Sequence, residues 1–162
     1  MTATEKKEQE KQAFVTSLRL LAASPKSRKS LERKLEEKGY DAGIIARVVK
    51  RLEAQGLLDD RAFAQLVFES LLGRRRSGRK RIAFELERKG IADALVGEVL
   101  EKYTPEDERE KARELARDKW ERWQKLEGPK RRKKVYDFLV RRGFEFDLCR
   151  NVVNEVARGT QS

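Results

Sequence analysis

Residues 31–52 read LERKLEEKGYDAGIIARVVKRL, and this stretch decides the fold. Before the glycine, Leu31 and Leu35 stand one helical turn apart, so both fall on the same face of a helix. After the glycine, apolar residues recur at helical spacing again, at Ile44, Val48, Val49 and Leu52. The stretch therefore predicts a helix, a tight turn at Gly39 and a second helix.

The same pattern occurs twice more, with Gly90 and Gly143 in the place of Gly39. A basic residue precedes each glycine and complements the negative end of a helix, while glycine tolerates the left-handed backbone that ends many helices. The apolar positions also keep their character, at Ile82, Leu86, Leu95, Val99 and Leu100 in the second copy and at Val135, Leu139, Leu148, Val152 and Val153 in the third. Such self-similarity predicts a helical repeat protein.

A further amphipathic stretch precedes each pair, so each unit is expected to hold three helices. The predicted fold is all-α, with three tandem three-helix repeats stacked into an elongated, curved rod. The expected domains are 1–56 with a charged N-terminal extension, 57–103, and 104–162 with a basic run and a short C-terminal tail. The predicted helices cover residues 5–23, 27–38, 41–55, 60–73, 78–89, 92–102, 105–126, 130–142 and 145–158.

Composition narrows the class of protein. The 162 residues include 39 Lys+Arg and 28 Asp+Glu, a net charge of +11, and 41% are charged against 38% hydrophobic. No apolar run reaches the roughly 18 residues of a membrane span, and the N-terminus lacks a signal-peptide core, so we expect a cytoplasmic protein without a membrane partner. With no histidine, one cysteine and no glycine-rich phosphate loop, the sequence predicts no enzyme, cofactor or metal.

The central part of the chain carries a family resemblance. The stretch GLLDDRAFA at 56–64, then GRKRI at 78–82, Glu85-Leu86 and Lys89-Gly90-Ile91, resembles the central signature of the RecX family, regulators of the bacterial recombinase RecA. In the third unit, Lys134-Val135, Phe138-Leu139 and Arg142-Gly143-Phe144 resemble that family's C-terminal repeat. The resemblance covers nearly the whole chain, although the first dozen residues match nothing and the basic run at 130–134 is longer than expected of the family.

The resemblance implies a non-enzymatic protein that lies in the groove of the RecA–single-stranded DNA filament. There it would bridge neighbouring subunits and alter ATP hydrolysis and strand exchange, with inhibition as the expected effect. The implied partners are the RecA filament and DNA, single-stranded and also double-stranded. The chain is expected to be a monomer.

Positive charge gathers at the predicted start of the second helix of each unit. Eleven of the fifteen residues at 26–30, 77–81 and 130–134 are basic. Because a helix start is already partly positive, cations there favour an outside anion such as phosphate more than they favour the helix. The predicted anion-binding residues, for nucleic acid or an acidic protein groove, are Lys26, Arg28, Lys29, Arg74, Arg75, Arg76, Arg79, Lys80, Arg81, Lys130, Arg131, Arg132, Lys133 and Lys134.

A few other residues invite a functional interpretation. Trp120 and Trp123 lie on the predicted helix 105–126, where we expect core packing, with base stacking as the alternative. Cys149 falls beside the apolar stripe and is expected to be a small, partly buried hydrophobe. Asp59-Asp60 is expected to cap the helix that carries Phe63 instead of binding a metal.

Two other functional classes stay open at this point. A nonspecific DNA- or RNA-binding helical-repeat protein also fits the basic clusters, and it would bind naked nucleic acid without any recombinase. A carboxylate-dependent nuclease needs acidic residues at metal-binding spacing, and the sequence has no such cluster.

Overall fold

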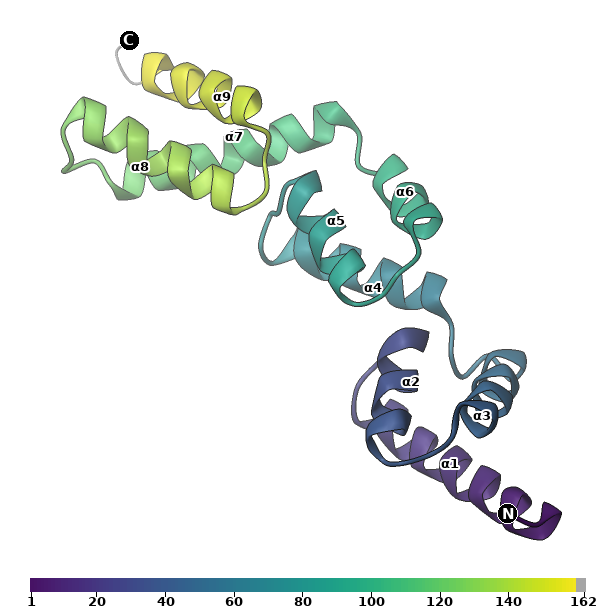
Figure 1. Cartoon of the computed structure of the whole chain (residues 1–162). Helices are drawn as coiled ribbons and strands as arrows, with labels where there is room; N and C mark the ends of the chain where they lie inside the picture. Colours follow the sequence, from purple (N-terminus) through teal and green to yellow (C-terminus); the bar gives the residue numbers. More distant parts are fainter. Residues whose placement is uncertain (160–162) are drawn as a thin grey trace.

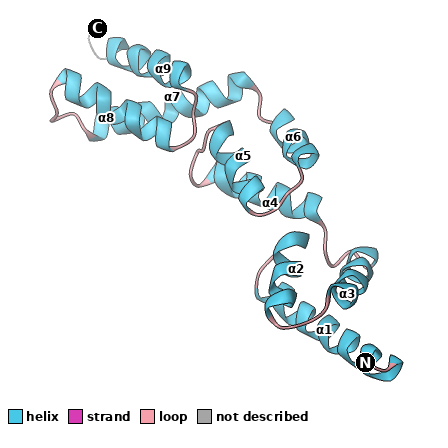
Figure 2. Cartoon of the chain, in the orientation of Figure 1, coloured by secondary structure: helices cyan, strands magenta, loops and turns pink. Residues whose placement is uncertain are grey.

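The computed structural model describes residues 1–159, and this part of the chain is helical without a strand (Figure 2). The helices form three units, placed one after another along a curved rod (Figure 1). This arrangement confirms the predicted all-α repeat fold. The helices of the described residues are α1 (Ala3–Ala23), α2 (Arg28–Glu37), α3 (Ala42–Ala54), α4 (Asp60–Gly73), α5 (Arg79–Arg88), α6 (Asp93–Glu101), α7 (Pro105–Arg122), α8 (Gly128–Arg141) and α9 (Phe146–Gly159).

Three helix ends differ from the predicted ones by two residues or more, for local reasons. Helix α1 begins at Ala3 instead of 5, because Thr2 and Glu5 form a reciprocal capping box. Helix α7 ends at Arg122 instead of 126, since Trp123 leaves helical geometry at φ −102° and ψ 30°. Helix α8 begins at Gly128 instead of 130, with a proline in its first turn.

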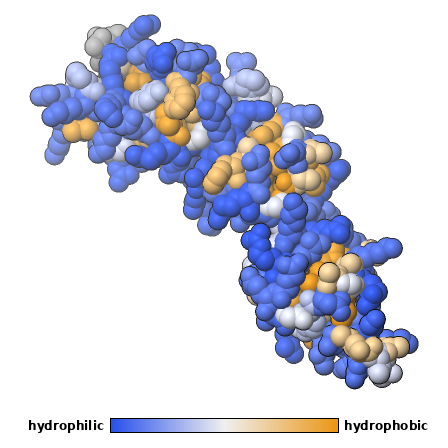
Figure 3. All heavy atoms as spheres, viewed as in Figure 1, coloured by the Kyte–Doolittle hydropathy of each residue, from blue (hydrophilic) through white to orange (hydrophobic). Residues whose placement is uncertain are grey.

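Each unit buries its own apolar core. Leu35, Leu86 and Leu139 are 0% exposed at equivalent positions of the three units, as the repeat predicts. In the described part of the chain, every two helices that pack extensively against each other belong to the same unit. Figure 3 shows hydrophilic side chains over most of the visible face, with separate apolar patches in each unit. The molecule is therefore three small cores joined by narrow junctions.

The turn between the second and third helices is the same in every unit. Gly39, Gly90 and Gly143 have φ values of +91°, +84° and +90°. Behind Gly90, the Ile91 amide donates to the Leu86 carbonyl at 3.0 Å, and the other two units repeat this bond. Left-handed glycine together with this bond is the Schellman arrangement, which ends a helix while satisfying its last carbonyls. Among residues 1–159, no helix combines the length and the apolar character that crossing a membrane requires.

Candidate nucleic-acid interface

The first basic cluster, Lys26, Arg28 and Lys29, lies at the junction between the first and second units. The Ser27 hydroxyl donates to the carbonyl oxygen of Lys89, in the glycine turn of the second unit. The Arg28 amide donates at 2.7 Å to the carboxylate of Asp60, at the start of α4. The amide at the start of α2 is thus bound by the protein's own carboxylate. Binding of an outside anion by the side chains of this cluster stays a prediction.

The second cluster, Arg79, Lys80 and Arg81 with Arg74–Arg76, lies at the junction between the second and third units. The amides of Gly78 and Lys80 donate to the carbonyls of Arg142 and Gly143, at 2.7 and 3.1 Å. The Arg79 amide reaches the carboxylate of Glu108 at 3.3 Å. Two of the three predicted helix starts are therefore used inside the protein to join one unit to the next.

Arg79 itself holds the end of α6. Its Nη1 donates to the carbonyl oxygen of Leu100 at 2.8 Å and also to that of Tyr103. Glu108, which is 4% exposed, lies 3.9 Å from Arg79 Nε. Burial raises the pKa of the Glu108 carboxyl, and the Arg79 amide and guanidinium oppose that rise. The Arg79 side chain thus links the end of α6 in the second unit to Glu108 in the third.

The third cluster, residues 130–134, differs from the other two. In the sequence, Arg131 is the counterpart of Ser27 and Gly78, which are the N-caps of α2 and α5. Helix α8 starts one turn earlier relative to its glycine, so Arg131 lies inside the helix. The Arg131 guanidinium donates to the carbonyl oxygen of Trp120 and lies 3.9 Å from the centre of its ring. A bulky, engaged side chain therefore stands at the position that the other two units use to join the unit that follows them.

Carboxylates neutralise some of the predicted cations and leave others unpaired. Arg28, Arg76, Lys80, Arg81 and Lys133 each form an ion pair of 3.1 Å or less. Arg132 instead donates to the Asn154 side chain at 3.1 Å. The other predicted cations within residues 1–159 form no ion pair with a carboxylate, and their side chains do not bond to α7 or α9. They are Lys26, Lys29, Arg74, Arg75, Lys130 and Lys134.

Cations from both units converge at the second junction. Burial, followed by the positive charges of Arg75, Arg76 and Arg81, lowers the pKa of the Arg142 guanidinium. The Arg142 side chain also donates to the Arg75 carbonyl at 2.9 Å, while Arg76 adopts a left-handed φ of 48° and pairs with Asp118 at 2.7 Å. We call Arg74, Arg75, Arg76, Arg81 and Arg142 the junction patch. Cations this close together attract an anion.

Two basic residues at the second junction, Arg142 and Lys119, are not among the anion-binding residues that the sequence predicts. In the sequence, Arg142 stands out only as the basic residue before the third glycine, and the fold brings it beside the second cluster. Lys119, on α7, also lies here, and burial together with Arg122 and Arg142 lowers its pKa. The recurring basic residue before each glycine is the signal that could have found Arg142, whereas nothing in the sequence singles out Lys119.

The remaining candidate residues pack in or beside the core or cap helices. Trp120 is buried, whereas Trp123 is only half-buried. Burial raises the pKa of the Cys149 thiol to about 12, so this side chain stays protonated and unreactive at neutral pH. Asp59 caps α4 as predicted, but Asp60 caps α2 of the preceding unit instead of its own helix.

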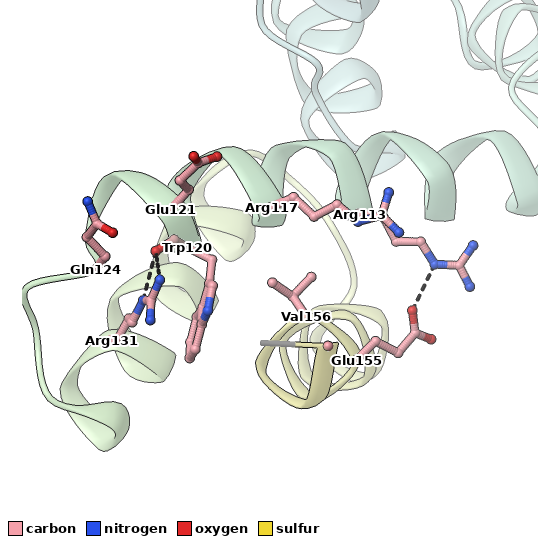
Figure 4. Close-up of a pocket in the computed structure, with 9 residues that line it drawn as sticks. Arg113, Arg117, Trp120, Glu121, Gln124, Arg131, Glu155 and Val156 are labelled. Carbon is pink, nitrogen blue, oxygen red and sulfur yellow. Dashed lines mark hydrogen bonds and ion pairs between the residues drawn. The ribbon is translucent and has the colours of Figure 1, made fainter. Parts of the chain in front are cut away.

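An open pocket in the third unit is lined by basic side chains (Figure 4). Two of its three arginines are engaged within the protein: Arg113 pairs with Glu155 at 2.8 Å, and Arg131 donates to the Trp120 carbonyl at 2.8 Å. The bonds to Glu155 lower the pKa of its carboxyl, with Arg113 making the largest contribution. Across residues 1–159, no group of three His, Cys, Asp or Glu side chains is placed to hold a metal ion.

Comparisons with known proteins agree with this architecture. Three family models match in chain order: the first three-helix domain of RecX at residues 13–52, the second at 59–100 and the third at 106–153. The regulatory protein RecX of Chlorobium phaeobacteroides is 32% identical over 149 residues, covering 92% of this chain and 96% of the relative. That of Mycolicibacterium smegmatis is 33% identical, covering 94% of this chain and 83% of the relative.

Solved structures show the same fold. The crystal structure of RecX from Lactobacillus salivarius superposes with a TM-score of 0.81 at 23% identity, covering 92% of this chain and 97% of that one. A second crystal structure, of regulatory protein RecX, gives a TM-score of 0.79 at 25% identity, covering 97% and 75% of the two chains. With three matching domains in order and relatives above 30% identity over most of its length, the chain belongs to the RecX family of regulatory proteins.

Proposed function

We propose that this protein binds along the RecA–single-stranded DNA filament and inhibits its ATPase and recombinase activities during DNA repair and recombination. Membership of the RecX family supports a regulatory role. The resemblance from which the RecA partner comes covers nearly all of the chain. In this role the protein acts by binding, without catalysing a reaction.

The observation that carries the proposal is the division of the rod into three cores with narrow junctions. A rod of similar units suits a helical filament because each unit can meet an equivalent subunit. Contacts that are weak one by one then add up through high effective concentration. A single compact core of the same size would reach fewer subunits.

The junction patch supports an anionic partner at the middle of this rod. Arg74 and Arg75 are exposed, and no carboxylate lies at ion-pair distance from either within residues 1–159. Phosphates of the filament DNA, or acidic side chains of the recombinase, would balance this charge. The patch therefore favours binding to an assembly that offers a groove lined with negative charge.

A nonspecific nucleic-acid-binding protein is the competing function, and binding measurements separate the two. The affinity for single-stranded DNA coated with RecA is compared with that for the same DNA alone, at one salt concentration. We expect tighter binding to the coated strand together with a fall in the filament's ATPase rate. Equal affinity for the two substrates, with an unchanged ATPase rate, would favour the nonspecific class.

A further inference from the structure

Two aromatic rings and three cations alternate along the face shared by α7 and α8. Lys119 lies in the last turn of α7, and Trp123 is the residue that caps this helix. Lys134 and Phe138 stand one turn apart on α8, and Arg142 caps its end. The two rings meet edge to face with their centres 5.9 Å apart. We call these five residues the cation–aromatic ladder.

Every ring of the ladder lies between cations. Lys134 Nζ is 4.5 Å from the centre of the Trp123 ring. Lys119 Nζ sits between the rings, 5.6 Å from Trp123 and 4.6 Å from Phe138. The Arg142 guanidinium carbon is 4.9 Å from the centre of Phe138. The order along the face is therefore Lys134, Trp123, Lys119, Phe138 and Arg142.

The cations of the ladder lack the carboxylate partners that the cations of two other cation–ring contacts have. Lys80 lies over Phe146 and Arg81 over Phe84, and each of these cations has a carboxylate partner, Glu145 at 3.1 Å and Glu85 at 3.0 Å. The three ladder cations have no carboxylate at ion-pair distance within residues 1–159. Three positive charges beside one another without an acid cost stability, and an outside anion would remove that cost.

Both rings are half-buried, so each keeps part of its surface open while its other side packs against the core of the third unit. That core already contains buried residues such as Val135, Leu139 and Trp120. Each ring thus keeps some exposed surface beside its cations that an incoming base can contact. Lys134 and Arg142 are two helical turns apart, about 12 Å along the helix axis, so they can contact two separate negative charges of one extended chain.

We propose that the cation–aromatic ladder is a binding site for single-stranded nucleic acid, in which Trp123 and Phe138 stack on bases and Lys119, Lys134 and Arg142 contact phosphates. Aromatic rings beside cations are the combination that binds unpaired strands without regard to sequence, because every base has a flat face. A double helix keeps its bases stacked on each other, so it offers these rings little. Arg142 also belongs to the junction patch, so a strand leaving the ladder meets Arg75, Arg76 and Arg81 next.

This inference does not depend on recombinase binding, and it is tested with the full chain and a short oligothymidylate alone. Phe138→Leu keeps an apolar side chain of similar reach but removes the stacking face. We expect about a tenfold loss of affinity for oligothymidylate, the effect of one stacked base. Affinity for inorganic polyphosphate, which offers phosphates without bases, should stay unchanged.

Phe14→Leu is the matched control. Phe14 is also a half-buried ring beneath a guanidinium, with Arg51 3.9 Å from its centre, but it belongs to the first unit. We expect this variant to bind oligothymidylate like the parent chain. An equal loss in both variants, or an equal loss of polyphosphate and oligothymidylate binding by Phe138→Leu, would overturn the stacking site.

Tryptophan fluorescence gives a second test that does not require replacing Phe138. Trp120→Phe leaves Trp123 as the sole tryptophan, and Trp123→Phe leaves only the buried Trp120. Oligothymidylate should strongly quench the tryptophan fluorescence of Trp120→Phe and quench that of Trp123→Phe far less. The reverse pattern, or no quenching in either, would contradict the proposal without bearing on the recombinase, whose regulation is measured by filament ATPase.

Discussion

The Gly78 amide donates a hydrogen bond of 2.7 Å to the carbonyl oxygen of Arg142, across the boundary between two three-helix units. A Cβ atom added to Gly78 would collide with the Gly143 carbonyl group, so the two backbones touch because neither glycine has a side chain at that point. The junction of the rod is thus a contact of main chain on main chain. It sets the position of the third unit and of the junction patch.

Gly78→Ala should therefore loosen this junction. We expect a loss of about 1–3 kcal/mol of unfolding free energy, the usual cost of overpacking, in urea titrations. Gly97→Ala is the control, because this helical glycine is exposed and an added Cβ would meet nothing within 4 Å. It should be neutral or gain up to about 1 kcal/mol. Equal stability of the two variants would show that the junction is not close-packed.

The buried Glu108 carboxyl should make the second junction sensitive to pH. Its pKa is raised chiefly by burial, so the folded chain holds this proton more tightly than the unfolded chain does. The contribution of this group to stability is therefore greatest below the unfolded value of about 4.3 and falls as the pH rises through the raised pKa.

Glu108→Gln removes this titration while keeping a side chain that can accept from the Arg79 amide. Urea unfolding of both proteins is measured across the acidic range. Relative to the glutamine variant, the parent chain should lose stability as the pH rises. A stability difference that does not change with pH would show that Glu108 titrates alike in the folded and unfolded chains.

The exposed arginines of the junction patch should account for part of the salt dependence of DNA binding. For single strands, the log–log slope of affinity against salt changes by about 0.7 for each phosphate that the protein no longer neutralises. Replacing Arg74 and Arg75 by Ala should make the slope shallower without unfolding the protein, because their side chains are exposed. Arg79 is unsuitable for this test, since its side chain holds the end of α6.

Lys6→Ala with Lys7→Ala is the matched control for that measurement. Both lysines are exposed on α1, and their replacement removes the same net charge at the far end of the rod. We expect little change of slope. If this control pair lowers the slope as much as the arginine pair, affinity depends on net charge and not on the junction patch.

The repeat pattern predicts the helices and the equivalent core positions because both follow from local spacing. Leu35, Leu86 and Leu139 are buried for the same reason that they recur: each anchors the apolar face before a glycine turn. Helix α8 shows the limit of this reasoning. Its extra turn places Arg131, the counterpart of the small cap residues of the other units, inside the helix. Only the fold reveals this turn and the contact of Arg131 with Trp120.

The basic clusters are visible in the sequence, but their use is not. Asp60 and Glu108 lie far along the chain from the amides that they bind, Arg28 and Arg79, and spacing in the sequence says nothing of such contacts. Lys119 and Arg142 likewise meet only because α7 and α8 pack together. Local periodicity therefore predicts elements and cores, whereas a charged surface depends on which units touch.

Regulation by a rod that spans several subunits requires more than one unit, and removal of the third unit tests this most directly. A chain ending after Tyr103 retains the second core, since Tyr103 packs edge to face on Phe68 and donates to the Ser77 carbonyl at 3.0 Å. Circular dichroism and urea unfolding would verify that residues 1–103 fold.

The decisive measurement is the ATPase rate of the RecA–single-stranded DNA filament, titrated with the full chain and with residues 1–103. We predict that the full chain lowers the rate and that the folded fragment, at equal concentration, lowers it far less, because it can meet fewer subunits at once. Equal inhibition by the two proteins, or an unchanged rate with the full chain, would contradict the bridging account.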